Sequence, residues 1–297
     1  MQTSYRGRIL NQLSVGASYT WSKSLDDASE IFGFTEVASP QSPFNRKLER
    51  GLSNFDRRHA AALNFLWDVP LMKEQKGWIG RLAGGWQLNG TYFIASGQRF
   101  TPVQQFNSFF TGIGYNDTTF DPTFFGADAV RPFTANPAAP RDSVGINEVD
   151  ALLAGFIAKV TNPQGFLSLN ELNRTGNAVS VTRDQVRYII NGPGAAQVFG
   201  SPFGTVSRGA EASPILNDLN LGLFKNIRLK ERFKLQLRLE AFNALNHPNP
   251  GVGFITSFRN GIPNRIIESA GSQDGFNDRG GITYARRGIQ LGAKIIF

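Results

Sequence analysis

Apolar and polar side chains alternate without interruption between residues 12 and 22. One set of alternate positions holds small neutral polar residues and glycine, and the other holds Leu13, Val15, Ala17, Tyr19 and Trp21. A period of two is that of a β-strand with one apolar and one polar face. The two aromatic residues lie together at one end of the apolar row, where an interfacial girdle of a membrane protein would have them. The segment therefore predicts a strand that presents one face to lipid.

Five further segments repeat this alternation, at residues 60–69, 86–95, 219–224, 233–240 and 289–297. In the fifth strand of the chain, four large apolar residues alternate with Lys234, Gln236, Arg238 and Glu240. The sixth strand has an apolar row of Ile289, Leu291, Ala293, Ile295 and Phe297, and its other row includes Gln290 and Lys294. We expect the polar side chains of these two strands to face the lumen of a barrel.

The lengths of the connections also alternate. A short polar turn is expected at residues 226–232, and a modest glycine-containing linker joins the second and third strands. The other connections are much longer, at about residues 23–58, 101–214 and 246–281. Outer-membrane barrels show this asymmetry, with short periplasmic turns and long extracellular loops. If Phe297 lies at the periplasmic end, every short turn lies on that side and every long loop outside.

The expected fold is thus all-β: an antiparallel transmembrane β-barrel to which residues 1–297 contribute about six C-terminal strands. Residues 101–214 are too long for a structureless connection, and we expect an elaborated extracellular loop that packs over the barrel mouth. Within it, residues 148–157 and 183–190 each suggest a short helix or strand. A small independent domain inserted there is the alternative.

Composition narrows the function. The chain has no cysteine and only two histidines, which disfavours most hydrolytic and metal mechanisms. Its charge of +8 is scattered, without the basic and aromatic cluster that nucleic-acid binding requires. The chain contains no run of about 18 apolar residues, so no transmembrane helix is expected. The first eight residues lack the apolar core of a secretory signal, so a barrel protein with this start is expected to be an incomplete product.

Two groups of residues are candidates for a chemical site. His59 and His247 are expected near the extracellular rim, where a barrel hydrolase could pair a histidine with Asp56. No nucleophile elbow, metal-binding histidine pair or phosphate-binding loop accompanies them. Three carboxylates, Asp117, Asp121 and Asp128, fit no defined calcium loop. We therefore expect no catalytic, cofactor-binding or metal-binding residue.

Several segments, in order and spread over nearly the whole chain, resemble TonB-dependent receptors, especially the large Oar-like receptors with a carboxypeptidase-regulatory-like N-terminal domain. They are NFDRRH at 54–59, GGWQLNG at 84–90, SGQRFT at 96–101, NDLNL at 217–221, FKN at 224–226, EAFNALNHP at 240–248 and GIQLGAKIIF at 288–297. The last resembles the family's C-terminal strand, the signal that the barrel assembly machinery recognises, with Ile289, Leu291, Ala293, Ile295 and Phe297 as its apolar positions.

The resemblance implies the barrel part of an outer-membrane receptor that takes up an external ligand of unknown identity. It also implies many more strands, a plug domain and a TonB box, none of which is recognisable in these 297 residues. Outer-membrane lipid, the barrel assembly machinery and, through the missing plug, the TonB complex are the expected partners. Six strands cannot close so wide a barrel, because diameter grows with strand number.

Two other interpretations remain at this point. A secreted or surface-exposed adhesin-like binding protein would pack the same strands as a sandwich in water. A small outer-membrane barrel hydrolase would use a histidine at the rim. The first predicts solubility without detergent, and the second predicts hydrolysis that is lost when His59 or His247 is changed.

Overall fold

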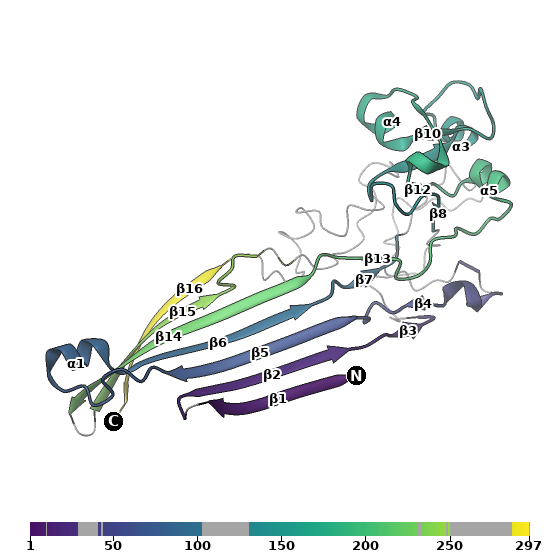
Figure 1. The fold of residues 1–297 in the computed structure, drawn as a ribbon. Coiled ribbons are helices and arrows are strands. Elements are labelled where there is room, and N and C mark those ends of the chain that lie inside the picture. Colours follow the sequence, from purple (N-terminus) through teal and green to yellow (C-terminus); the bar gives the residue numbers. More distant parts are fainter. Residues whose placement is uncertain are drawn as a thin grey trace.

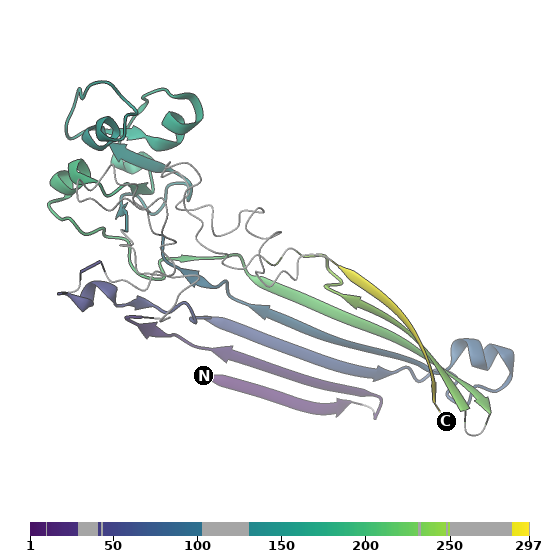
Figure 2. The ribbon, with the colours of Figure 1, turned by 180° about the vertical axis from the view of Figure 1, so that it is seen from behind.

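The computed structural model describes residues 1–9, 11–28, 41–42, 44–102, 131–230, 233–247, 249 and 287–296. Two parts stand out in Figure 1: a long twisted antiparallel sheet, and a compact unit of helices and short strands beyond one end of it. Figure 2 gives the same arrangement from behind, with the chain's N-terminus at the end of the compact unit and its C-terminus at the other. We call residues 131–210, which form the compact unit, the insert.

Seven strands form the sheet, in the order β1-β2-β5-β6-β14-β15-β16. All neighbours are antiparallel. The strands are β1 (Gln2–Ile9), β2 (Leu13–Trp21), β5 (His59–Asp68), β6 (Trp86–Ala95), β14 (Leu216–Lys230), β15 (Phe233–Phe242) and β16 (Gly288–Ile296). Among the described residues, β1 and β16 are the edges of the sheet and do not pair with each other. The sheet is therefore large and antiparallel, as expected, but open.

Two expectations about the strands were wrong. The structure has a seventh strand, β1, ahead of the six that alternation predicts. The expected polar turn at residues 226–232 is also wrong in its first five residues, because β14 runs on to Lys230. Ile227 pairs with Leu235 and Arg228 with Lys234, so apolar and polar side chains keep alternating there.

The connections between strands differ at the two ends of the sheet. Short links join β1 to β2 and β14 to β15, and the expected linker between β5 and β6 contains a helix, α1 (Gly77–Ala83). In Figure 1, α1 and the C-terminus lie at one end, and the insert lies at the other. The described parts of the connections between β2 and β5 and between β6 and β14 belong to the insert end. This alternation of short and long connections agrees with the sequence pattern.

The insert is a folded α/β unit rather than an irregular loop. Its five-stranded sheet has the order β11-β10-β9-β12-β8, from β8 (Phe133–Thr134), β9 (Val144–Asn147), β10 (Phe166–Ser168), β11 (Ser180–Val181) and β12 (Tyr188–Ile189). Three helices pack with it: α3 (Glu148–Leu153), α4 (Leu169–Thr175) and α5 (Pro193–Phe199). The short elements expected near residues 148–157 and 183–190 thus correspond to α3, to the 3-10 turn η2 (Arg183–Gln185) and to β12.

Capping residues explain why such short helices begin where they do. The Asn147 side chain accepts a hydrogen bond from Val149 N at 2.9 Å, and Ser168 does the same for Glu171 N at 3.3 Å. The start of α5 uses Pro193 in its first turn and the carboxylate of Asp150, which accepts from Gly194 N and Ala195 N. Each device satisfies N–H groups that have no partner inside the helix. Local polar residues therefore define the insert's helices more than amphipathic periodicity does.

Four short strands and a 3-10 turn lie between the large sheet and the insert. They are β3 (Leu25–Asp26) with β4 (Gly51–Leu52), β7 (Arg99–Phe100) with β13 (Glu211–Ala212), and η1 (Arg46–Glu49). The β7 and β13 pair is antiparallel, with Glu211 opposite Phe100. The chain thus enters and leaves the insert along one ladder.

Burial is divided unequally between the two parts. Among the described residues, every buried apolar side chain except Ala95 belongs to the insert, where two clusters form around Ile146 and Ile189. The large sheet has no such core among its described residues, and Leu237 and Leu239 in the middle of β15 are 42% and 41% exposed. A water-soluble sandwich would cover such a face with a second layer. The described residues contain no second layer of this kind.

Candidate functional site: the two faces of the sheet and the contacts of the insert

Strand register gathers most of the large apolar side chains onto one face of the seven strands, although Leu66, Phe93 and Phe224 lie on the other. Tyr19 lies opposite Ala61, Leu63 opposite Tyr92, and Leu223 opposite both Leu88 and Leu239. Since residues opposite each other in a ladder point to the same side, one row extends across the sheet. We call it the apolar face. On β15 and β16 it consists of Leu235, Leu237, Leu239 and Ala241 with Ile289, Leu291, Ala293 and Ile295.

Aromatic residues mark both ends of the apolar face. Tyr19 and Trp21 lie at the insert end, while Trp67, opposite Leu13, and Trp86, opposite Lys225, lie at the end near α1. Strands β2, β5, β6 and β15 have 9 or 10 residues, close to the about 9–11 that span a bilayer when tilted. An apolar band between two aromatic girdles is typical of the outer surface of a transmembrane barrel.

The opposite face of the sheet, which we call the polar face, carries the six expected lumen residues: Lys234, Gln236, Arg238, Glu240, Gln290 and Lys294. Glu240 lies opposite Gln290, and Gln236 lies opposite Lys294. None of these six takes part in an ion pair within the part of the chain that the structure describes. That this face lines a lumen stays a prediction.

Side-chain hydrogen bonds tie neighbouring strands together on the polar face. Gln236 Nε2 donates to Asn226 Oδ1 at 2.8 Å, and Arg238 Nε donates to Gln236 Oε1 at 2.7 Å. The Arg238 guanidinium also lies 5.1 Å from the ring centroid of Phe224. Between β5 and β6, Gln87 Nε2 donates to Asp68 Oδ1 at 2.7 Å. The face is therefore an ordered polar surface.

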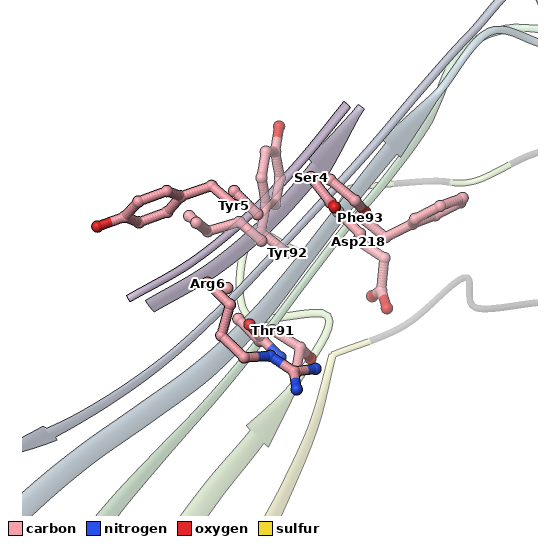
Figure 3. Close-up of a pocket in the computed structure, with 13 residues that line it drawn as sticks. Ser4, Tyr5, Arg6, Thr91, Tyr92, Phe93 and Asp218 are labelled. Carbon is pink, nitrogen blue, oxygen red and sulfur yellow. The ribbon is translucent and has the colours of Figure 1, made fainter. Parts of the chain in front are cut away.

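A hollow of about 610 Å³ lies on the sheet across β1, β2, β5, β6 and β14. Its floor is low because the residues at its centre are small, including Gly16, Ser18 and Ala62. In Figure 3, Arg6, Thr91 and Asp218 point to one side of the sheet, and Tyr5 and Tyr92 point to the other. The hollow thus offers one cation and one carboxylate on the polar face, from opposite sides of a cradle of small residues.

The two histidines and Asp56 each make a separate set of contacts in the structure. His59 Nδ1 is 2.7 Å from the Tyr19 hydroxyl, while Asp56 accepts from Ser24 N at 2.8 Å and pairs with Arg99 at 3.7 Å. His247 Nδ1 lies 3.1 Å from Asn249 Oδ1 in a different connection. Asp56, which is buried, thus fixes the connection between β2 and β5 at the sheet's end.

Buried ion pairs fasten the connection between β2 and β5 to the insert. Arg131 Nη2 binds Glu49 Oε2, and Arg131 Nη1 donates to Leu48 O at 3.1 Å and to Val206 O at 3.3 Å. Arg208 Nη1 lies 3.0 Å from Asp26 Oδ1. Glu49, Arg131 and Arg208 are each less than a tenth exposed. Two acidic residues of the connection between β2 and β5, Asp26 and Glu49, thus pair with two arginines of the insert.

Another buried carboxylate, that of Glu211 on β13, holds the insert at the point where the chain leaves it. It accepts hydrogen bonds from the guanidinium of Arg187 and, at 2.7 Å, from the Tyr188 hydroxyl. Burial, together with the hydrogen bond to Glu211, raises the pKa of Tyr188, which therefore stays neutral as a donor. Arg141 Nε lies 3.5 Å away on the exposed side. These contacts orient the insert relative to β13.

The comparisons with known proteins agree with this geometry. A family model described as "Outer membrane beta barrel domain" matches residues 1–279. The chain belongs to this family. Membership places the protein in the outer membrane, as the alternation of side chains predicts. No curated protein and no solved structure matches the chain.

The barrel domain's described residues contain no helix that is long and apolar enough to cross a membrane. They also contain no group of three or more residues that could hold a metal ion. Four residues discussed from the sequence, Asp117, Asp121, Asp128 and Phe297, lie outside the described residues.

The contacts of the insert could not be found from the sequence. Glu49 and Arg131 are 82 residues apart, and Glu211 is 24 residues from Arg187, with no motif that links the members of either pair. Single arginines and glutamates in polar connections are ordinary surface residues by composition. By contrast, the sequence could assign each candidate lumen residue to the polar face, because strict alternation decides the face on which a side chain lies.

Proposed function

We propose that this barrel domain is the C-terminal part of a TonB-dependent receptor that takes up an external ligand across the outer membrane. In this proposal the apolar face meets lipid and the polar face lines the lumen. The insert lies outside the cell at the mouth of the barrel. The family-like segments from residue 54 to residue 297 support the receptor identity, since they occur in order over most of the chain.

The observation that carries the proposal is the exposed apolar face between two aromatic girdles, with a polar face behind it. In water, exposing so many large apolar side chains on one surface would be unfavourable. In a bilayer the same face is satisfied, provided that no strand edge is left open to lipid. In this proposal the edges of β1 and β16, which are unpaired in the described sheet, pair with further strands of a complete barrel.

A complete receptor of this kind would contain further strands and a plug domain. The hollow near Arg6 and Asp218 and the polar residues of β15 would then contact the plug or the passing ligand. We propose no catalytic role for the domain, because its two histidines and Asp56 are engaged in separate structural contacts. Energy for uptake would come from the TonB complex, acting through the plug.

We also propose that the barrel assembly machinery recognises the apolar row of the C-terminal strand. Ile289, Leu291 and Ile295 are exposed on β16, at an edge of the described sheet. An unpaired edge with a regular apolar row can pair with a strand of another protein.

The first test is the genomic sequence upstream of Met1. A continuous reading frame that encodes a signal peptide, a plug with a TonB box and further alternating strands would support the receptor. A stop codon directly upstream, together with solubility of the expressed chain without detergent, would contradict it. A second test is cross-linking of the full gene product to the periplasmic domain of TonB, with deletion of the TonB box as the control. Cross-linking that persists after the deletion would contradict the proposed coupling.

A further inference from the structure

Helix α1 lies on the apolar side of the large sheet. Lys225 occupies a position of the apolar face, opposite Trp86 on β6 and Leu237 on β15. Its ammonium group is 4.7 Å from the ring centroid of Trp86 and donates to the carbonyls of Leu82, at 2.8 Å, and Gly84. Trp86 Nε1 donates to the same Leu82 carbonyl at 3.1 Å. Two side chains of the apolar face thus reach the C-terminal end of α1.

The segment before α1 fixes the helix from its other end. The buried side chain of Gln75 donates through Nε2 to Asn226 O at 2.7 Å and accepts through Oε1 from Arg228 N at 3.0 Å. Gly80 packs against Gln75, since a Cβ at Gly80 would lie 2.9 Å from the Gln75 carbonyl carbon. The face of α1 that contains Gly80 therefore points to the protein, and its orientation on β14 is set.

The opposite face of α1 is apolar and exposed. Trp78, Ile79 and Leu82 follow the spacing of one helix face and are 76%, 52% and 66% exposed. Leu71 and Met72 are exposed just before the helix. Exposed cationic side chains accompany this surface, at Lys73, Lys76 and Arg81, and they outnumber the exposed carboxylate of Glu74, which pairs with Lys76 at 2.6 Å. A short helix with this composition is typical of a segment that lies in a membrane surface.

We infer that α1 is a membrane-surface anchor whose Trp78, Ile79 and Leu82 insert between the headgroups and acyl chains of periplasmic-leaflet phospholipid. The inference rests on the proposed lipid-facing orientation of the apolar face. Continuity identifies the occupant, because Trp86 belongs to the apolar face and also contacts α1. Trp78 is suited to the interface, where tryptophan is enriched, and the cations suit anionic headgroups.

Because the chain has no cysteine, single cysteines can report on this surface. The variants are Trp78→Cys and Ile79→Cys on α1, Glu74→Cys as an exposed control in the same connection, and Leu237→Cys on the apolar face. Each full chain is labelled with bimane and folded into vesicles of phosphatidylethanolamine and phosphatidylglycerol. We expect acyl-chain spin labels to quench bimane at residues 78, 79 and 237, and aqueous iodide to quench it at residue 74.

The outcomes separate this inference from the proposed function. Quenching by lipid at residue 237, with residues 78 and 79 open to iodide, would overturn the anchor and leave the lipid-facing sheet intact. Absence of lipid quenching at all three positions would overturn both. Protection of residues 78 and 79 only when another outer-membrane protein is present would also overturn the anchor, because the occupant would then be a protein.

Discussion

Glu49 and Arg131 form an ion pair whose side chains are only 7% and 5% exposed, and this pair joins two long connections of the barrel domain. Glu49 also accepts from Gln41 N at 2.9 Å, so its carboxylate has partners on both sides. A buried charge that loses its partner is strongly destabilising, whereas apolar replacement of both members is often tolerated. The pair is thus a structural contact whose loss should be local to the insert end.

Glu49→Leu alone should loosen the attachment of the insert by about 3–5 kcal/mol, because the buried Arg131 guanidinium then lacks the carboxylate that balances its charge. Hydrogen exchange at the amides of η1 and β13 should become faster, while the amides of β15 remain protected. The double variant with Glu49→Leu and Arg131→Met should recover most of the protection. Equal loss in the single and double variants would contradict the pairing argument.

Glu148 offers a pH-dependent test within the insert. Its carboxylate accepts from Thr161 N at 2.7 Å, Thr161 Oγ1 at 2.8 Å and Asn162 N at 2.8 Å. Burial raises the pKa of Glu148, but these hydrogen bonds lower it by more, so the pKa lies below its ordinary value of 4.5. The stabilisation is therefore present above the ordinary value and is lost as pH falls through the lowered pKa.

Glu148→Gln should consequently destabilise the insert by about 1 kcal/mol at pH 7, since one charged acceptor is lost. Hydrogen exchange of α3 and β10 amides measures this difference between variant and wild type. The difference should shrink as the pH falls below 4.5. A difference that stays constant down to the lowest pH at which the protein folds would refute the charge-based explanation.

Adjacent residues on β15 separate the two faces of the sheet. Leu239→Arg puts a charge on the apolar face and should cost about 2–4 kcal/mol near the bilayer midplane. Glu240→Arg, one residue away on the polar face and opposite Gln290, should cost little. Urea titration of each variant in lipid vesicles gives the two free energies of unfolding. Similar losses for both variants would show that neither face is preferentially in lipid.

The C-terminal strand gives a comparable pair for assembly. Leu291→Asp interrupts the apolar row of β16, whereas Gly292→Asp adds the same charge on the polar row. We expect only Leu291→Asp to reduce the amount of folded protein in isolated outer membranes, because it alters the row proposed for recognition. If Gly292→Asp reduced it equally, the apolar row would not be the signal.

Sequence alternation predicted the large sheet well because successive side chains of a strand point to opposite faces of the sheet. Strand β1 was missed since Gly7 and two arginines dilute its pattern, although Tyr5 and Ile9 lie on the apolar face. The end of β14 was mistaken for a turn because of its charges, yet Ile227 continues the row.

The insert and α1 were harder to predict for another physical reason. Helices of 6 or 7 residues are too short to show a periodic stripe, and two-residue strands show no alternation. Their positions depend on caps such as Asn147 and on distant partners such as Glu211 and Arg187. Polar contacts between residues far apart in the chain leave no periodic signal, so only the structure reveals them.

The most direct test of a lipid-facing and a lumen-facing side is a cysteine scan of residues 234–241 on β15, in the protein folded in vesicles. A membrane-impermeant thiol reagent, present on both sides of the bilayer, should label residues 234, 236, 238 and 240, and acyl-chain quenchers should reach probes at 235, 237, 239 and 241. This alternation would establish that the sheet spans the membrane with its polar face toward water. Uniform labelling of all eight positions would contradict the account.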